Sequence, residues 1–218
     1  MWNLFANGEQ IMRAADCKNL SEKPEGVFRQ SQHLKMLSQF YMQEVLFMKL
    51  LIASDIHGSA YWCSRLCELV EQEQPDKLIL LGDLLYHGPR NDLPRDYAPK
   101  QVIPMLSKYQ DKIIAVRGNC EAEVDQMVLP FPCMADFSQL VTEDAVFYLT
   151  HGHHHNPEHL PPLSEGSIFL YGHTHVKQDV VIGGIRCLNP GSVSIPKDGS
   201  HSCLIYENKE FYFRFLED

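Results

Sequence analysis

The stretch Ser54-Asp55-Ile56-His57-Gly58 directly follows an apolar run at residues 49–53. Residues two apart in an extended chain point the same way, so Asp55 and His57 place a carboxylate and an imidazole on one side of a strand end. Taken alone the pair is a weak signal, because an aspartate in a turn beside a surface histidine is more common. Gly58 allows the backbone to turn sharply beneath a bound ligand, which favours the functional interpretation.

Four more motifs follow, each directly after a short apolar run that predicts a buried strand. They are Gly82-Asp83, Arg117-Gly118-Asn119, His151-Gly152-His153 and Gly172-His173-Thr174-His175. With His153 left aside, the motifs together place two carboxylates, one amide and four imidazoles at the ends of successive strands. Oxygen and nitrogen donors in this mixture suit a pair of divalent transition ions such as Mn, Fe or Zn. The set therefore predicts a two-metal site.

Several of these residues also have ordinary structural interpretations. Asp83 follows four apolar or small residues, where an aspartate serves equally well as a helix N-cap or a turn residue. Asn119 belongs to a residue type that is most often found in turns. His154 and His155 extend the tract after His153, and both are predicted to be exposed loop residues without a metal role.

The order and spacing of the motifs resemble the calcineurin-like metallophosphoesterase superfamily, and within it the bacterial YfcE-type phosphodiesterases, which share the Gly-Asn-Cys variant. The resemblance implies that one metal is held by Asp55, His57, Asp83 and His175. It implies that the other is held by Asp83, Asn119, His151 and His173, so that Asp83 bridges the ions. It also implies an α/β fold, a four-layer αββα sandwich of two mixed β-sheets flanked by helices, with the metals at the carboxyl ends of the central strands.

From this resemblance we expect a dinuclear metal-dependent phosphodiesterase that hydrolyses a small phosphodiester by attack of metal-bound hydroxide. Mn is the expected metal because the mixed ligand set suits it, and Fe, Zn, Ni and Co are the alternatives. A phosphomonoesterase or protein phosphatase uses the same chemistry at phosphorus. A protein-binding scaffold, as in the retromer subunit of the superfamily, is the other alternative. Such a scaffold is expected to have lost ligands, whereas every ligand position here holds a competent residue type, which favours an enzyme.

The main departure from the broader superfamily lies in Gly118-Asn119-Cys120-Glu121. Many members have a histidine where Cys120 stands, and that histidine protonates the leaving oxygen. A thiol with an ordinary pKa of about 8.5 is still protonated at neutral pH, but it is a less versatile acid than imidazole. Cys120 is therefore either the general acid or an inert packed residue. His57 is the competing candidate for the acid.

Three further residues are assigned to the phosphate or the substrate. Arg117, in the third motif, is assigned a catalytic role, and Arg90, which lies just past Asp83, is assigned to substrate binding. The planar guanidinium suits the non-bridging oxygens of a phosphate, while a solvated surface position is the alternative for both arginines. His153 is assigned to the substrate side of the site. The proline-rich loop at residues 86–99 is expected to carry specificity.

The bulk composition agrees with a globular enzyme. The chain has 218 residues, enough for one domain with a substantial core, and its hydrophobic share of 44% is ordinary. A net charge of -9 argues against broad binding to nucleic acid or an anionic membrane. The apolar runs are too short to span a bilayer, and the seven cysteines contain no Cys-x-x-Cys pair. We therefore expect a cytoplasmic protein without membrane contact, and self-association as a homo-oligomer is left open.

Residues 1–47 do not share the alternation of strand and motif. We expect them to be an N-terminal extension outside the native fold, with translation starting at Met48. A helical arm is the alternative, because apolar residues recur there at helical spacing. Residues 48–218 form the predicted metallophosphoesterase domain.

Helices in this domain are predicted at residues 61–73 and 100–107, where Pro104 indicates a kink or a late start. Strands are predicted at residues 49–53, 77–81, 113–116, 146–150, 168–171, 179–182, 185–188, 192–195, 202–206 and 211–215. Alternating strands and helices followed by hairpins indicate a mixed α/β fold in which two sheets face each other. The segment Asn189-Pro190-Gly191-Ser192 predicts a tight structural turn near the last histidine pair.

Overall fold

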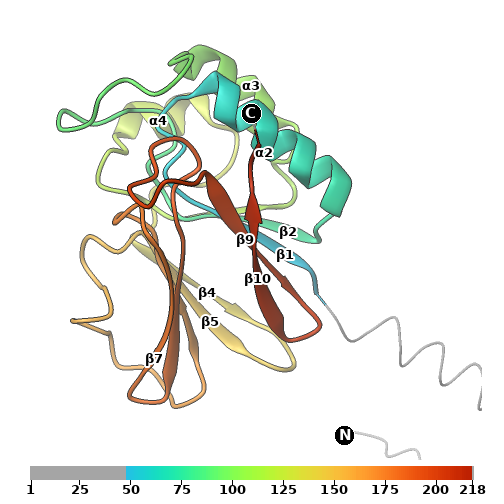
Figure 1. Ribbon diagram of the computed structural model, residues 1–218, viewed down its shortest axis with the longest axis vertical. Helices are drawn as coiled ribbons and strands as arrows, with labels where there is room; N and C mark the ends of the chain where they lie inside the picture. The colour runs from blue at the N-terminus through green and yellow to red at the C-terminus, as the bar shows by residue number, and fades with distance from the viewer. Residues whose placement is uncertain (1–47, 218) are drawn as a thin grey trace, which may run out of the picture. The chain divides into compact units, whose positions relative to one another are not determined.

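The computed structural model describes residues 48–217, and Figure 1 shows how their helices and strands are arranged. In chain order the elements are β1 (Leu50–Ala53), α2 (Ala60–Glu73), β2 (Lys77–Leu80), α3 (Pro99–Ser107), β3 (Ile113–Ala115), α4 (Glu123–Val128), β4 (Phe137–Val141), β5 (Val146–Thr150), β6 (Ile168–Leu170), β7 (Lys177–Ile182), β8 (Ile185–Pro190), β9 (Ser202–Glu207) and β10 (Glu210–Phe215). The predicted extension at residues 1–47 lies outside the described residues, so the domain boundary stays a prediction.

The strands form two mixed sheets of five strands each. The first has the order β10-β9-β1-β2-β3, with β1, β2 and β3 parallel and the other two antiparallel to their neighbours. The second has the order β4-β5-β6-β8-β7, with β5, β6 and β8 parallel and the edge strands antiparallel. The predicted α/β sandwich of two mixed sheets is confirmed.

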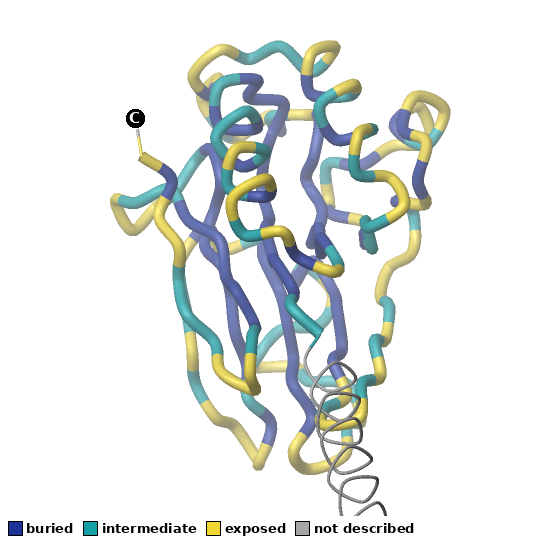
Figure 2. The backbone as a smooth tube through the Cα atoms, turned by 90° about the vertical axis from the view of Figure 1, so that its right-hand side faces the viewer, coloured by how far each residue is buried: buried dark blue, intermediate teal, exposed yellow. Residues whose placement is uncertain are grey.

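Strand β1 shows how the layers are built. Successive side chains of a strand point to opposite faces of its sheet. Leu51 and Ala53 pack in the core beneath the helices, whereas Leu50 and Ile52 pack in the core between the two sheets. All four residues are fully buried, which explains the uninterrupted apolar run in the sequence. Figure 2 shows the same burial along the central strands.

Helices α2 and α3 pack on the first sheet. Helix α2 begins after Ser59, whose hydroxyl accepts the Trp62 amide at 3.2 Å. It ends at Glu73 and is followed by Gln74, which adopts a left-handed conformation. Part of the outer face of the second sheet packs instead against Leu160 and Leu163 of the loop between β5 and β6. In the described part of the chain, a loop therefore covers part of this face, where the prediction placed a helical layer.

Some local predictions differ from the structure. The predicted strand at residues 192–195 is wrong, because this segment forms bends instead of pairing with a sheet. Strand β4 and helix α4 have no counterpart in the prediction. Strand β4 is an edge strand whose residues are only exposed or half-buried, and α4 has six residues, too few for a clear helical period. Helix α3 begins at Pro99, which occupies the first turn of the helix, where proline is favoured. The helix therefore does not start later than residue 100, as Pro104 had suggested it could.

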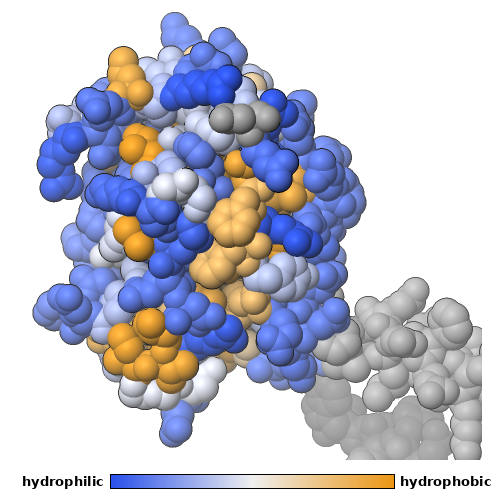
Figure 3. All heavy atoms as spheres, viewed as in Figure 1, coloured by the Kyte–Doolittle hydropathy of each residue, from blue (hydrophilic) through white to orange (hydrophobic). Residues whose placement is uncertain are grey.

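Exposed apolar side chains gather on edge strands of the second sheet. Phe137 and Val141 on β4 are 52% and 68% exposed, and Val181 and Ile182 on β7 are 68% and 39% exposed. Figure 3 shows a hydrophobic area near β7 within a largely hydrophilic face. Between residues 48 and 217, no helix has the length and apolar character needed to cross a membrane.

Candidate metal centre

The five sequence motifs meet at the carboxyl ends of the central strands of both sheets. The loops after β1 and β2 are joined by backbone hydrogen bonds, among them Asp55 N to Gly82 O at 3.1 Å. The loops after β5 and β6 are joined in the same way, by Gly172 N to His151 O at 2.8 Å. Parallel neighbours end at one edge of a sheet, so these loops bring together side chains that are far apart in the sequence.

One group of polar side chains consists of Asp55, His57 and His175. The Oδ1 atom of Asp55 lies 3.5 Å from Nε2 of His57 and 3.2 Å from Nε2 of His175. The two Nε2 atoms lie 3.3 Å apart. All three residues are buried, so their contacts form with little water present.

A second group consists of Asp83, Asn119, His151 and His173. Nε2 of His151 lies 3.4 Å from Asp83 Oδ2, 3.1 Å from Asn119 Oδ1 and 3.3 Å from His173 Nδ1. Asp83 Oδ2 also lies 3.7 Å from Nε2 of His57 in the first group. Asp83 therefore stands between the two groups.

Backbone carbonyls orient three of the four imidazoles. Each Nδ1 atom lies within hydrogen-bonding distance of a carbonyl oxygen: His57 of Tyr86 (2.8 Å), His151 of Leu81 (2.7 Å) and His175 of Ile195 (2.7 Å). A carbonyl oxygen only accepts, so each Nδ1 donates and the neutral ring keeps its lone pair on Nε2. This arrangement is typical of metal-binding histidines, whose second nitrogen is held by a carbonyl or carboxylate.

The backbone at this site adopts an unfavourable conformation. Nine non-glycine residues of the described chain have a positive φ, and five of them are predicted ligands: Asp55 (59°), His57 (47°), Asp83 (55°), His173 (67°) and His175 (61°). Residues with a side chain pay roughly 1–3 kcal/mol for such conformations, which persist only where the surroundings enforce them. Their concentration here indicates a functional site.

Contacts from distant loops hold Asp55 in this conformation. The hydroxyls of Ser192 and Ser194 donate to its carbonyl oxygen at 2.9 and 3.1 Å, and the His173 amide donates to Oδ2 at 3.1 Å. The tight turn predicted at residues 189–192 is not formed, because Asn189 and Pro190 end strand β8. The Asn189 side-chain amide donates to the carbonyl of Gly172 at 2.7 Å, so the end of β8 supports the loop that carries His173.

Two glycines are needed because other groups approach their Cα atoms closely. A Cβ atom on Gly118 would collide with Oδ1 of Asp83, and one on Gly172 would collide with the Ser54 hydroxyl. Both positions therefore require glycine for packing around the site.

Glu121 was missed by the sequence reasoning. Its buried carboxylate accepts the backbone amides of Gly118 (2.5 Å), Asp83 (2.8 Å) and Leu84 (2.6 Å). Burial and the nearby charge of Asp83 raise its pKa to about 7, although the three amides lower it. The carboxylate thus ties the loop after β3 to the loop after β2. A single glutamate forms no repeating pattern in the sequence. The only sequence signal for its role is its position directly after Cys120 in the third motif.

The donor set fits two divalent cations. Asp55 Oδ1 is buried and has no hydrogen-bond donor among the described residues. Burial alone lowers the pKa of His151, yet the bond to Asp83 and the charges of Asp55 and Asp83 raise it to about 9. The pocket therefore attracts positive charge. Carboxylate, amide and imidazole donors are the ligands that divalent transition ions accept.

A cavity of about 290 Å³ opens onto these groups and is lined by Asp83, Arg90, Asn91, Asn119, His173, His175 and Lys197. This volume is near the lower end for small-molecule sites. Two larger hollows, of about 510 and 480 Å³, lie beside α2 and α3 and contain none of the predicted site residues. The chemistry of the lining favours the smaller cavity as the candidate functional one. Lys197 had no role in the sequence prediction.

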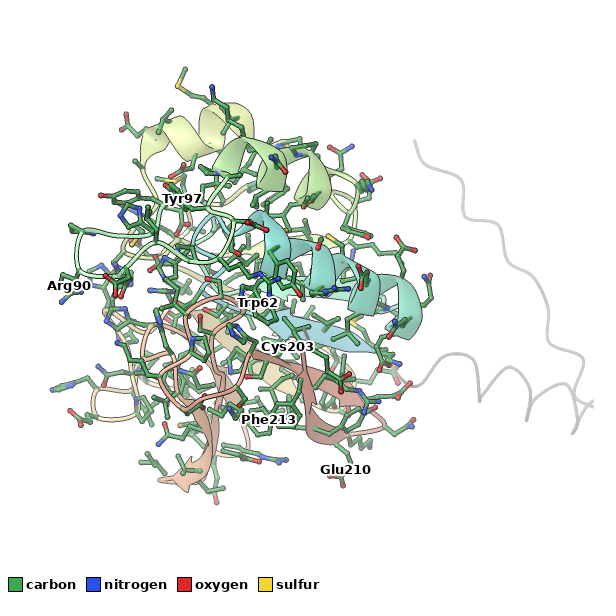
Figure 4. All side chains as sticks on the ribbon, turned by 45° about the horizontal axis from the view of Figure 1, so that its top comes forward. Trp62, Arg90, Tyr97, Cys203, Glu210 and Phe213 are labelled. Atoms are coloured by element: carbon green, nitrogen blue, oxygen red, sulfur yellow. The ribbon has the colours of Figure 1, made fainter. Side chains whose placement is uncertain are left out.

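The two predicted arginines are placed differently. Arg90 lines the cavity, on the loop between β2 and α3 that is visible in Figure 4. The Arg117 guanidinium lies instead 4.0 Å from Asp136, and Arg117 is not among the described residues that line the cavity. The structure therefore supports substrate contact by Arg90 and gives no support to a catalytic role for Arg117.

His153 lies beside the second group of side chains. Its ring centroid is 5.4 Å from that of His151 and 6.2 Å from that of His173. Its Nδ1 atom is buried without a hydrogen-bond partner among the described residues. Burial and the neighbouring histidines lower its pKa to about 4, so the ring is neutral at neutral pH. His153 is near enough for its assigned place on the substrate side, which stays a prediction.

Cys120 lies at the edge of both groups. Its sulfur and one ligand atom each of His57 and Asp83 all lie within 4.8 Å of one another. Burial, followed by the charge of Asp83, raises the pKa of the thiol, so it stays protonated at neutral pH. The thiol therefore holds a proton next to the site.

Residues 48–210 match the family model described as the calcineurin-like phosphoesterase superfamily domain. The chain belongs to this superfamily. It is 50% identical over 153 residues to phosphodiesterase YfcE of Escherichia coli K12, which covers 70% of this chain and 83% of that relative. The resemblance to calcineurin-like phosphoesterases and the class of phosphoester hydrolase are thereby confirmed.

Solved structures of the superfamily have the same fold. The E. coli YfcE phosphoesterase superposes with a TM-score of 0.73 at 43% identity, covering 78% of this chain and 100% of that one. An archaeal phosphodiesterase superposes with a TM-score of 0.57 at 22% identity, covering 78% of this chain and 100% of that one. The second likeness concerns the fold alone.

Proposed function

We propose that this calcineurin-like phosphoesterase is a dinuclear metal-dependent phosphodiesterase that acts on a small substrate. The observation that carries the proposal is the meeting of seven donor residues in two adjacent groups, with Asp83 between them. The relationship to phosphodiesterase YfcE supports a diester as the substrate.

The two groups indicate how the ions would be held. The first ion would be held by Asp55, His57, Asp83 and His175, and the second by Asp83, Asn119, His151 and His173. Mn is the proposed metal because oxygen and nitrogen donors are mixed in both sets. When bound, the pair supplies Lewis acidity toward the phosphoryl oxygens and hydroxide at neutral pH.

The chain itself supplies positioning, charge and a proton. Arg90 in the cavity wall would bind the non-bridging oxygens of the phosphate through its guanidinium. The protonated thiol of Cys120 would donate to the leaving oxygen. Cys120 competes with His57 for this role: the thiol keeps its proton at neutral pH but its raised pKa makes it a weak acid, whereas Nε2 of His57 faces the carboxylate of Asp55.

The alternatives differ in substrate or in the need for metal. A phosphomonoesterase would use the same residues, and the size of the cavity does not separate it from a diesterase. A protein-binding scaffold would have no need for a complete donor set. The completeness of the set in this chain favours the enzyme.

The test is an assay of metal-free protein reconstituted with Mn, Co, Ni, Zn or Fe, comparing bis(p-nitrophenyl) phosphate with p-nitrophenyl phosphate. We expect kcat/KM for the diester to exceed that for the monoester by at least about tenfold, a difference of about 1.4 kcal/mol in transition-state binding. A preference for the monoester would contradict the diesterase. Hydrolysis of neither compound with any metal would favour the scaffold.

A further inference from the structure

Two basic side chains line the cavity from loops far apart in the sequence: Arg90 follows β2, and Lys197 lies between β8 and β9. Neither forms an ion pair with any residue in the range 48–217. Many other basic side chains do so: Lys49 with Glu73, Arg65 with Glu68, Lys177 with Asp198, Arg186 with Asp179 and Arg214 with Glu73. Other exposed lysines of the described chain, such as Lys100, also lack an ion pair, but Arg90 and Lys197 differ from them in lining one cavity. In a protein with a net charge of -9, two cations in the wall of one cavity indicate an anionic ligand.

The backbone of Lys197 is fixed next to His175. Its amide donates to the His175 carbonyl at 2.9 Å, and the His175 ring in turn donates from Nδ1 to Ile195 at 2.7 Å. The next residue, Asp198, accepts both the amide and the ammonium of Lys177 at 2.8 Å. The Lys197 main chain is therefore anchored on both sides, while its exposed side chain is free to meet a ligand.

A simple diester does not account for both cations. A phosphodiester carries one negative charge, which the proposed divalent ions and Arg90 would already face. The carboxylate that lines the cavity, Asp83, accepts the Cys120 amide at 2.8 Å and faces His151 at 3.4 Å. Neither the phosphate nor the carboxylate of Asp83 therefore needs the charge of Lys197. Its ammonium is available for a second anionic group of the substrate.

We propose that Lys197 selects phosphodiesters whose non-leaving arm ends in an anionic group, a carboxylate or a phosphate. The proposal rests on the phosphodiesterase function above and adds a substrate class to it. An ammonium meets such a group as a mobile point charge and requires no fixed geometry. Because Lys197 is exposed, salt should weaken the selection.

The test uses p-nitrophenyl diesters that share one leaving group and differ only in the other arm: 3-carboxypropyl, 3-phosphopropyl, propyl and choline. The native protein should show about 5- to 10-fold higher kcat/KM for the anionic arms than for propyl, mainly through KM, with choline lowest. In Lys197→Met, kcat/KM should become similar for all four diesters. In Lys197→Glu the order should reverse, with choline highest and the anionic arms lowest. Lys100→Glu, the same charge change at an exposed lysine outside the cavity, should keep the native order.

Calorimetric binding of 3-carboxypropyl and propyl methylphosphonates provides a second readout that needs no turnover. We expect the native protein to bind the carboxylate-bearing analogue about 5- to 10-fold more tightly and Lys197→Met to bind both equally. The proposal would be overturned if the native protein had the same kcat/KM for all four diesters. It would also be overturned if Lys197→Glu lowered kcat/KM by the same factor for every diester. Failure of the native protein to hydrolyse any of the diesters would instead overturn the diesterase function.

Discussion

At the scale of single residues, the carboxylate of Asp83 is contacted on both of its oxygens. Oδ1 accepts the Cys120 amide at 2.8 Å, while Oδ2 faces Nε2 of His151 and of His57 at 3.4 and 3.7 Å. The backbone amide of Asp83 is held by Glu121 at 2.8 Å. One aspartate therefore connects both groups of side chains and depends on a second carboxylate for its own position.

Replacing Glu121 with glutamine should weaken the backbone hydrogen bonds that hold the loops carrying Asp83 and Asn119. The variant keeps one oxygen but turns an NH2 group toward amides that can only donate, which leaves at least one buried donor unpaired. We expect a loss of roughly 1–3 kcal/mol in the free energy of unfolding and a roughly 10- to 100-fold loss in metal affinity. Thermal unfolding and metal titration check this, with the exposed Glu143→Gln as the control. An unchanged melting temperature together with unchanged metal affinity would show that Glu121 positions nothing.

Changes at Cys120 should separate a proton donor from a packed thiol. An alkyl diester leaves as a poor alkoxide and needs an acid, whereas nitrophenolate does not. If Cys120 is the acid, Cys120→Ala should lose roughly 10²–10⁴-fold in alkyl-diester hydrolysis and far less with bis(p-nitrophenyl) phosphate. Cys120→Ser keeps a hydrogen-bonding group that is much harder to deprotonate. Metal content should be unchanged, and Cys67→Ala, which alters a half-buried thiol on α2, serves as the control. If Cys120→Ala caused equal, small losses of activity with the alkyl diester and with bis(p-nitrophenyl) phosphate, Cys120 would have only a packing role.

At the scale of elements, the sequence predicts best where a strand is buried on both faces. Strand β1 is such a case, and its apolar run predicts it within about one residue. The alternating Ser192-Val193-Ser194-Ile195 also resembles a strand, but the two hydroxyls bond to the Asp55 carbonyl and hold the segment in bends. A local alternation of polar and apolar residues does not distinguish a solvent-facing side chain from one that binds a distant carbonyl.

The end of helix α2 gives a prediction about pH. Glu73 accepts from Lys49 at 2.6 Å and from Arg214 at 2.9 Å. The bond to Lys49 lowers the pKa of Glu73 below its ordinary value of 4.5, although burial opposes this. Because the folded pKa is below the unfolded one, the stabilisation is complete above about pH 4.5 and is lost as the pH falls through the folded pKa.

Glu73→Gln should therefore be less stable than the native protein at pH 7 by about 1 kcal/mol, which lowers the melting temperature by about 2–4 °C. The difference should shrink as the pH falls below about 4.5 and through the folded pKa, because the protonated carboxyl of the native protein is then neutral, like the glutamine amide. Melting temperatures of both proteins from pH 3 to 7 check this, with the more exposed Glu68→Gln as the control. A difference that stays constant across this range would contradict the ion-pair account.

At the scale of the whole molecule, the site exists because strands of both sheets deliver their carboxyl ends to one place. The sequence predicts the seven donors, since each follows a recognisable strand. It does not predict where side chains on loops turn, so Lys197 was missed and Arg117 lies beside Asp136. Such positions depend on contacts between loops far apart in the chain, which no local pattern encodes.

The most direct test of the central claim is the metal content of the native protein and of Asp83→Asn, measured with activity before and after chelation. The native protein should lose hydrolysis of bis(p-nitrophenyl) phosphate in chelator, regain it with Mn²⁺ and then hold two ions per chain. Asp83→Asn should lose affinity for both ions and roughly 10²-fold or more in turnover, because one ligand serves both. Asp111→Asn, an exposed aspartate before β3, should behave as native. Full activity after dialysis against excess chelator, or two tightly held ions and near-normal turnover in Asp83→Asn, would contradict the bridged two-metal site.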